Sequence, residues 1–345
     1  MSGHPRMLGR IARTAPLVLV ALALLPGGAA AHVKWFAPYD VPAQPKLLSG
    51  VFSPTFGELV VAAMVGLWLL GLVERTALGA AVLRAIERYH EHLRPRTEDL
   101  MRGMGALFFV ALFTLGNIIL TPELKTDLPA IPWLQCVIAL LMFWRSTLVL
   151  AAAGIAALWA YGVYTYGIFH LLDYPIFLGL AVYFALTGLG ERRLLGLRPI
   201  DFARWGAAIT LMWASVEKWA YPQWTDPLLQ AHPSLCMGFN SDFYMVAAGS
   251  VEFSLSFSLL WTPLVRRLAA IVLNAMFISA IFTFGTIDAI GHSMIIACLI
   301  AIALDDQPII RRAPILAPVS YGAALAATFA AYYGGHALLY GTMIW

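Results

Sequence analysis

The stretch RRLAAIVLNAMFISAIFTFGTIDAIGHSMIIACLIAIAL, residues 266–304, decides the fold of this chain. It contains two apolar segments, residues 267–286 and 290–304, joined by a short turn. A helix needs roughly 20 apolar residues to cross the hydrocarbon core of a bilayer. The stretch therefore predicts two consecutive membrane-spanning helices with a tight connection between them.

The rest of the chain has the same character. Of its residues, 61% are hydrophobic and 12% are charged, whereas a soluble domain carries about 25% charged residues. No segment alternates in the manner of a β-barrel strand. We predict an all-α polytopic membrane protein with about ten transmembrane helices, and the third and fourth segments could also form one helix. The expected segments are 55–73, 103–121, 132–144, 147–166, 174–190, 203–220, 243–261, 267–286, 290–304 and 316–338.

A secretory signal precedes these segments. Residues 14–25 are apolar and follow three arginines, a Pro-Gly-Gly break comes next, and Ala29-Ala30-Ala31 has the small-residue pattern of a cleavage site. We predict a cleavable signal peptide over residues 1–31 and a periplasmic N-terminal segment over residues 32–54.

Cleavage after Ala31 would make His32 the new N-terminus. A terminal histidine carries two nitrogen donors, the α-amine and the imidazole, and Cu(II) favours such nitrogen sets in tetragonal geometry. His32 is therefore a candidate copper ligand. Every cleavage leaves some residue first, so the same junction is also consistent with no metal role.

The basic residues predict the orientation. All fifteen arginines beyond the signal fall on one side of the expected helices, and all four lysines fall on the other. Because basic residues concentrate in cytoplasmic loops, we predict a bacterial inner-membrane protein whose mature N- and C-termini are periplasmic. Residues 55–102 then hold the first transmembrane helix and a cytoplasmic amphipathic helix. The net charge of +3 reports this bias, and we expect a lipid bilayer and no nucleic acid as partner.

An internal repeat divides the chain. Tyr164-Thr165-Tyr166-Gly167 recurs as Phe282-Thr283-Phe284-Gly285, and the register holds without gaps from residues 150–186 to 268–304. The repeat predicts two four-helix bundles, residues 103–190 and 203–304, followed by a C-terminal transmembrane helix within 316–345. Tandem halves commonly place a site at their interface.

The second half also carries a family resemblance. Glu217-Lys218 end one helix, Gly249 and Glu252 lie in the next, and Arg266-Arg267 open a third. With these residues the chain resembles the DoxX-like superfamily of four-helix bacterial membrane proteins. The first half shares this resemblance only through the internal repeat. There Gln135 and Leu140 stand near the position that corresponds to Glu252.

The resemblance implies a redox setting. Relatives include the membrane part of a thiosulfate:quinone oxidoreductase and proteins that aid the maturation of periplasmic redox enzymes. This chain differs in being doubled, in its secreted N-terminal segment and in lacking a CxxC pair.

Glu252 is the first candidate for chemistry. It lies in an expected transmembrane helix, where a charge costs roughly 2.5 kcal/mol or more, so it needs a partner inside the bundle. Lys218 is the cation that the topology favours, and Glu217 precedes it. We name all three as candidate catalytic residues. They form either a structural ion pair or a proton-handling carboxylate beside a quinone or metal.

Histidines gather at the predicted periplasmic side. We name His32, His170, His232 and His336 as candidate metal ligands, because histidine is the commonest metal ligand. Asp288 and His292, spaced i, i+4 on one helix face, are a candidate cofactor site. Each histidine is also consistent with a solvated or interfacial position.

The sequence contains three cysteines. Cys136 and Cys236 could pair in an oxidising periplasm, and Cys298 is expected to pack as an apolar residue.

The sequence is consistent with three functions. The first function is redox or metal handling with copper or quinone and a periplasmic redox partner. The alternative is a non-catalytic accessory or maturation subunit of a periplasmic redox system. A transporter is weaker, because the cytoplasmic half looks poor in buried ionisable residues.

Overall fold

The computed structural model describes residues 33–307 and 316–345, and all regular elements in those ranges are helical. Short 3-10 turns are η1 (Val33–Trp35), η2 (Arg94–Arg96), η3 (Arg145–Thr147) and η4 (Pro233–Cys236). The α-helices are α2 (Leu48–Val51), α3 (Pro54–Val73), α4 (Ala77–His90), α5 (Thr97–Leu115), α6 (Ala130–Leu141), α7 (Leu148–Tyr166), α8 (Ile168–Leu171), α9 (Pro175–Gly188), α10 (Pro199–Ala220), α11 (Pro222–Ala231), α12 (Ser241–Ser258), α13 (Pro263–Phe284), α14 (Thr286–Leu304) and α15 (Leu316–Tyr340). The predicted all-α class is confirmed.

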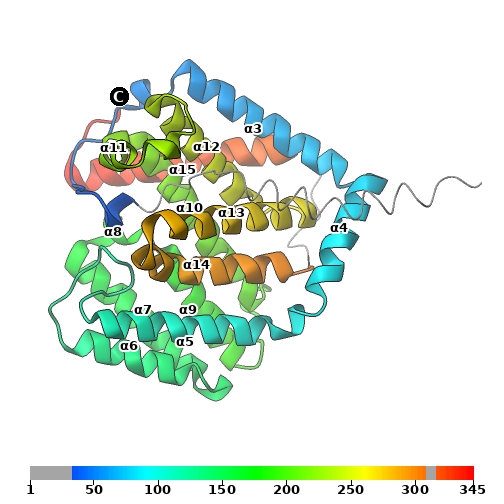
Figure 1. Cartoon of the computed structure of the whole chain (residues 1–345), viewed down its shortest axis with the longest axis vertical. Coiled ribbons are helices and arrows are strands. Elements are labelled where there is room, and N and C mark those ends of the chain that lie inside the picture. The colour runs from blue at the N-terminus through cyan, green and yellow to red at the C-terminus, as the bar shows by residue number, and fades with distance from the viewer. Residues whose placement is uncertain (1–32, 308–315) are drawn as a thin grey trace, which may run out of the picture.

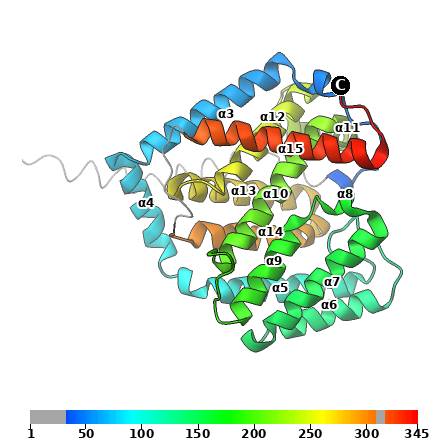
Figure 2. The same cartoon turned by 180° about the vertical axis from the view of Figure 1, so that it is seen from behind.

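The helices pack in two sequential groups. In the first, α5, α6, α7 and α9 each contact the next, and α10, α12, α13 and α14 do the same in the second. The groups meet where α9 packs on α10 and α5 packs on α14, while α3 and α15 lie side by side against the second group (Figure 1, Figure 2). The tandem duplication stays a prediction, and this packing is compatible with it.

Four helices in the described ranges are long and apolar enough to cross a membrane: Pro54–Val73, Arg145–Tyr166, Pro263–Phe284 and Thr286–Leu304. The chain is therefore a helical membrane protein. The other six expected segments also coincide with helices, but α6 and α9 span only 12 and 14 residues. The remaining four do not reach the same combination of length and apolarity, so the count of ten stays a prediction.

The predicted cytoplasmic segment is divided differently from what the sequence suggested. The amphipathic helix α4 ends at His90, and α5 begins at Thr97 rather than at residue 103. Glu98 and Asp99 lie in the first turn of α5, where acidic side chains are favoured by the helix dipole. The helix therefore begins among charged residues that precede the expected apolar segment.

The two repeated motifs end helices in the same way. Tyr166 ends α7 and Phe284 ends α13, and each is followed by a glycine with positive φ, 85° at Gly167 and 76° at Gly285. Glycine adopts this region without the steric cost of a Cβ. Both motifs therefore let the chain reverse directly into a further helix.

Arginines are buried at the end of the bundle near α4. Arg204, Arg266 and Arg267 are fully buried. Arg198 Nη1 lies 2.8 Å from Asp305 Oδ1, Arg266 Nη2 donates to the Asp305 carbonyl at 2.7 Å, and Arg204 also pairs with Asp305. The expectation that this half is poor in buried ionisable residues is therefore wrong. Hydropathy assigned these arginines to helix ends, and it cannot show that one aspartate draws them together.

We expect Asp305→Asn to destabilise the fold. Burial alone would raise the pKa of Asp305, but hydrogen bonds from Arg198 and the charges of Arg204 and Arg266 outweigh it and hold that pKa below its usual value. A lowered carboxyl pKa contributes stability at neutral pH that is lost as the pH falls below about 4. Removing one partner of a buried pair costs about 3–5 kcal/mol.

Thermal unfolding in mild detergent checks this expectation. Asp306→Asn is the matched control, because Asp306 pairs with Arg94 at a largely exposed position and should matter by less than about 1 kcal/mol. Equal midpoints for the two variants at pH 7 would contradict the role given to Asp305.

Candidate functional site

The candidate site lies at the end of the bundle that carries α8 and α11, opposite α4 (Figure 1, Figure 2). There α10 ends at Ala220, α9 begins at Pro175, and the segment that follows the predicted signal peptide lies across them. His32 falls outside the described residues. The next residue, Val33, is buried and packs in the core.

Lys34 anchors this N-terminal segment. Its side chain is 2% exposed; the ammonium lies 2.7 Å from Glu217 Oε1 and also pairs with Asp173. Burial lowers the pKa of Lys34, but the two carboxylates outweigh it and raise the pKa above its ordinary value. Lys34 is thus a buried cation held by the start of α9 and the end of α10. Sequence reasoning placed Lys34 only in a periplasmic segment.

A carboxylate and an imidazole face each other beside Lys34. Glu123 lies in the loop between α5 and α6, and its Oε1 lies 3.9 Å from His170 Nε2. Neither Glu123 oxygen nor this His170 nitrogen has a hydrogen-bond partner in the described part of the chain. Burial raises the pKa of Glu123 to about 7 and lowers the pKa of His170 to about 3. The imidazole is therefore neutral, with a nitrogen lone pair available.

The expected pairing of Lys218 with Glu252 is present. Lys218 Nζ lies 2.7 Å from Glu252 Oε2, and both side chains are nearly buried. The preceding Glu217 turns instead toward Lys34 and accepts a hydrogen bond from Tyr332 at 3.5 Å. Glu217 and Lys218, which are adjacent at the end of α10, thus pair with different residues. A catalytic role for either stays a prediction.

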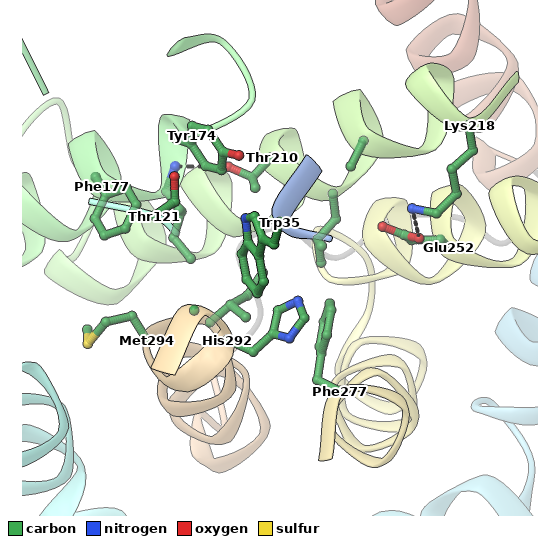
Figure 3. A pocket seen from close by; sticks show the side chains of 15 residues that line it. Trp35, Thr121, Tyr174, Phe177, Thr210, Lys218, Glu252, Phe277, His292 and Met294 are labelled. Carbon is green, nitrogen blue, oxygen red and sulfur yellow. Dashed lines mark hydrogen bonds and ion pairs between the residues drawn. The ribbon is translucent and has the colours of Figure 1, made fainter. Parts of the chain in front are cut away.

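A cavity opens between the two helix groups next to this pair. The centre of a water molecule can reach about 60 Å³ inside it, and one buried water needs roughly 10–15 Å³ on that measure. Figure 3 shows Trp35 extending into the cavity above His292, with the Lys218–Glu252 pair to one side. The Trp35 and Phe277 rings lie 4.6 Å and 4.7 Å from the His292 ring. The cavity is therefore lined by aromatic rings around one imidazole.

Asp288 and His292 stand together, as their i, i+4 spacing predicts. Asp288 Oδ2 lies 3.0 Å from His292 Nδ1. Asp288 is fully buried and His292 is buried at the cavity wall. Both Asp288 oxygens and His292 Nδ1 lack a partner with hydrogen-bond geometry among the described residues. Buried polar groups are normally satisfied, so such an exception needs a water, ion or ligand.

The other candidate metal ligands have separate surroundings. His336 Nε2 donates to the Val41 carbonyl at 2.7 Å, and Nδ1 lies 2.8 Å from Thr342 Oγ1. His232 packs edge-on against Phe284. In residues 33–307 and 316–345, no three His, Cys, Asp or Glu side chains form a metal-binding group. A site that includes His32 stays a prediction, while His336 ties α15 to the N-terminal segment.

The cysteines are all free. Cys236 and Cys298 are buried and Cys136 is partly buried. The suggested Cys136–Cys236 disulfide is therefore not formed, and Cys298 packs in the core as expected.

No protein-family model, curated protein or solved structure matches this chain. The resemblance to the DoxX-like superfamily accordingly stays an expectation, and the function has to be argued from the site itself.

The Lys218–Glu252 pair gives a direct stability prediction. Lys218→Met should leave Glu252 as an uncompensated charge and destabilise the fold by about 3–5 kcal/mol. The double variant Lys218→Met/Glu252→Leu should recover most of the loss, because replacing both partners by apolar groups removes the unpaired charge. Thermal unfolding in detergent measures both. Additive losses in the double variant would show that the pair does not interact energetically.

Proposed function

We propose that this chain is an inner-membrane redox protein that binds a quinone head group in the cavity beside His292. The observation that carries the proposal is His292, which lines a cavity walled by aromatic rings and lies beside the buried Asp288; the facing atoms of the two side chains lack hydrogen-bond partners among the described residues. Ligand pockets are typically apolar and aromatic with a few convergent polar groups. A quinone, which is a flat apolar ring with carbonyl acceptors at its edge, fits this combination.

The residues have distinct roles in this proposal. His292 donates a hydrogen bond to a quinone carbonyl, and the Asp288 carboxyl group lies beside the ring, 3.0 Å from the imidazole Nδ1. Trp35 and Phe277, which already flank the imidazole, pack against the quinone ring. Lys218 and Glu252 line the same cavity and supply a polar wall. Oxidation of a quinol in this cavity would release two protons to polar groups at the site end of the bundle. It would pass two electrons to a periplasmic redox partner.

The proposed membrane placement has structural support. Buried arginines lie at the α4 end, whereas Lys34 and Lys218 lie at the site end. Tyr164 and Phe282, which are equivalent in the repeat, are each 87% exposed. Aromatic side chains prefer the membrane–water interface, so both motifs suit the outer boundary of the bilayer. We therefore propose a periplasmic site, periplasmic mature termini and ten spanning helices in two tandem bundles.

Binding of a water-soluble quinone tests the proposal. Ubiquinone-1 and menadione are titrated into nanodisc-embedded protein, and binding is followed by calorimetry. We expect His292→Ala to weaken binding about tenfold, the equivalent of 1.4 kcal/mol, because it removes a hydrogen bond in a desolvated site. Trp35→Ala should also weaken binding, through lost ring packing.

His232→Ala is the matched control, because it removes a histidine at the same end that does not line the cavity. A folded wild-type protein that binds neither quinone would reject the proposal and favour the non-catalytic accessory function. Equal affinities for wild type and His292→Ala would reject the assigned site.

A further inference from the structure

Glu123 and His170 form a second buried carboxylate–imidazole pair that the proposed quinone site does not use. Glu123 comes from the loop after α5 and His170 from α8, and their side chains are 2% and 4% exposed. Both Glu123 oxygens and His170 Nε2 lack hydrogen-bond partners in the described residues. The histidine ring is held between the edges of Tyr39 and Tyr166, with centroids 5.5 Å and 5.4 Å away. The two groups are thus fixed, buried and unsatisfied.

The distance between them points to a bound ion. At 3.9 Å, Glu123 Oε1 and His170 Nε2 are too far apart for a hydrogen bond. A transition metal bound to both atoms at roughly 2.0–2.2 Å allows a separation of up to about 4.2 Å. The two atoms can therefore share one ion at a wide ligand–metal–ligand angle, and a tetrahedral arrangement brings them a few tenths of an ångström closer.

The local charge also calls for a cation. Lys34 is the buried ammonium of this cluster, and the carboxylates around it are Asp173, Glu217 and Glu123. Burial raises the pKa of both Glu123 and Asp173, so protons share the negative charge of this cluster at neutral pH. Buried charges are retained only when they are paired or coordinate a metal. A bound cation would replace these protons and hold the carboxylates in their ionised form.

We propose that His170 Nε2 and the Glu123 carboxylate bind one divalent transition-metal ion, Cu(II) or Zn(II), at the same end of the bundle as the quinone cavity. Imidazole nitrogen and carboxylate oxygen suit both metals, and the affinity order places Cu(II) first. This site uses residues outside the cavity, so it stands or falls independently of the proposed function.

Metal content and copper titration of the intact protein test the proposal. Untagged protein in detergent is loaded with CuSO₄ or ZnCl₂ at pH 7.5, dialysed and analysed by mass spectrometry for metal per chain. We expect about one ion per wild-type chain, and at least a tenfold weaker affinity for Glu123→Gln and for His170→Gln. His92→Ala is the matched control and should bind as the wild type does, because His92 is an exposed histidine just after α4, at the opposite end of the bundle. His32→Ala is a separate arm, because His32 precedes Lys34 by two residues and is itself a predicted copper ligand.

The outcomes decide cleanly. Less than about 0.2 ion per wild-type chain, or wild-type affinity in both Glu123→Gln and His170→Gln, would overturn the proposal. Loss of binding in His32→Ala alone would also overturn it and assign the metal to the terminus. If the Glu123 and His170 variants do not fold, pulsed electron paramagnetic resonance of copper-loaded wild type decides, since absence of imidazole nitrogen coupling contradicts the site.

Discussion

The burial of Lys34 between Asp173 and Glu217 is the interaction on which the site end of this protein depends. Moving an ammonium out of water costs several kcal/mol, which only close carboxylates offset. The two acids come from the turn just before α9 and from the end of α10. The N-terminal segment therefore joins the two groups at the place where the cavity opens. Breaking this contact would leave two buried carboxylates without a cation.

The position of Lys34 also determines that of its neighbour Trp35. The indole packs so closely against α14 that a Cβ on residue 291 would lie 2.2 Å from its ring, and only glycine leaves that space. His292, the next residue, is thereby covered by the indole. A segment that begins just after the predicted signal peptide thus forms one wall of the candidate site.

Sequence reasoning succeeded best for features that depend on residues close together in the chain. All ten apolar segments coincide with helices, Asp288 and His292 share a helix face as their spacing requires, and the cation chosen for Glu252 is correct. The Glu123–His170 pair joins residues 47 positions apart, and Asp305 draws arginines from the starts of two different helices, α10 and α13. Periodicity and hydropathy carry no information on such distant pairs. The burial of Lys34 could not be predicted from the sequence either, because a lysine in a polar segment normally faces water.

Amide hydrogen exchange of the N-terminal segment tests the central claim most directly. We compare Lys34→Met with Lys46→Met in nanodiscs; the latter removes a lysine of the same segment outside the buried cluster. We expect that, of the two variants, only Lys34→Met loses protection against amide exchange across residues 33–47. The exchange rates there should rise at least tenfold. Helices at the α4 end should keep their wild-type rates. Unchanged protection of residues 33–47 in Lys34→Met would contradict the claim that this buried lysine holds the segment and the site together.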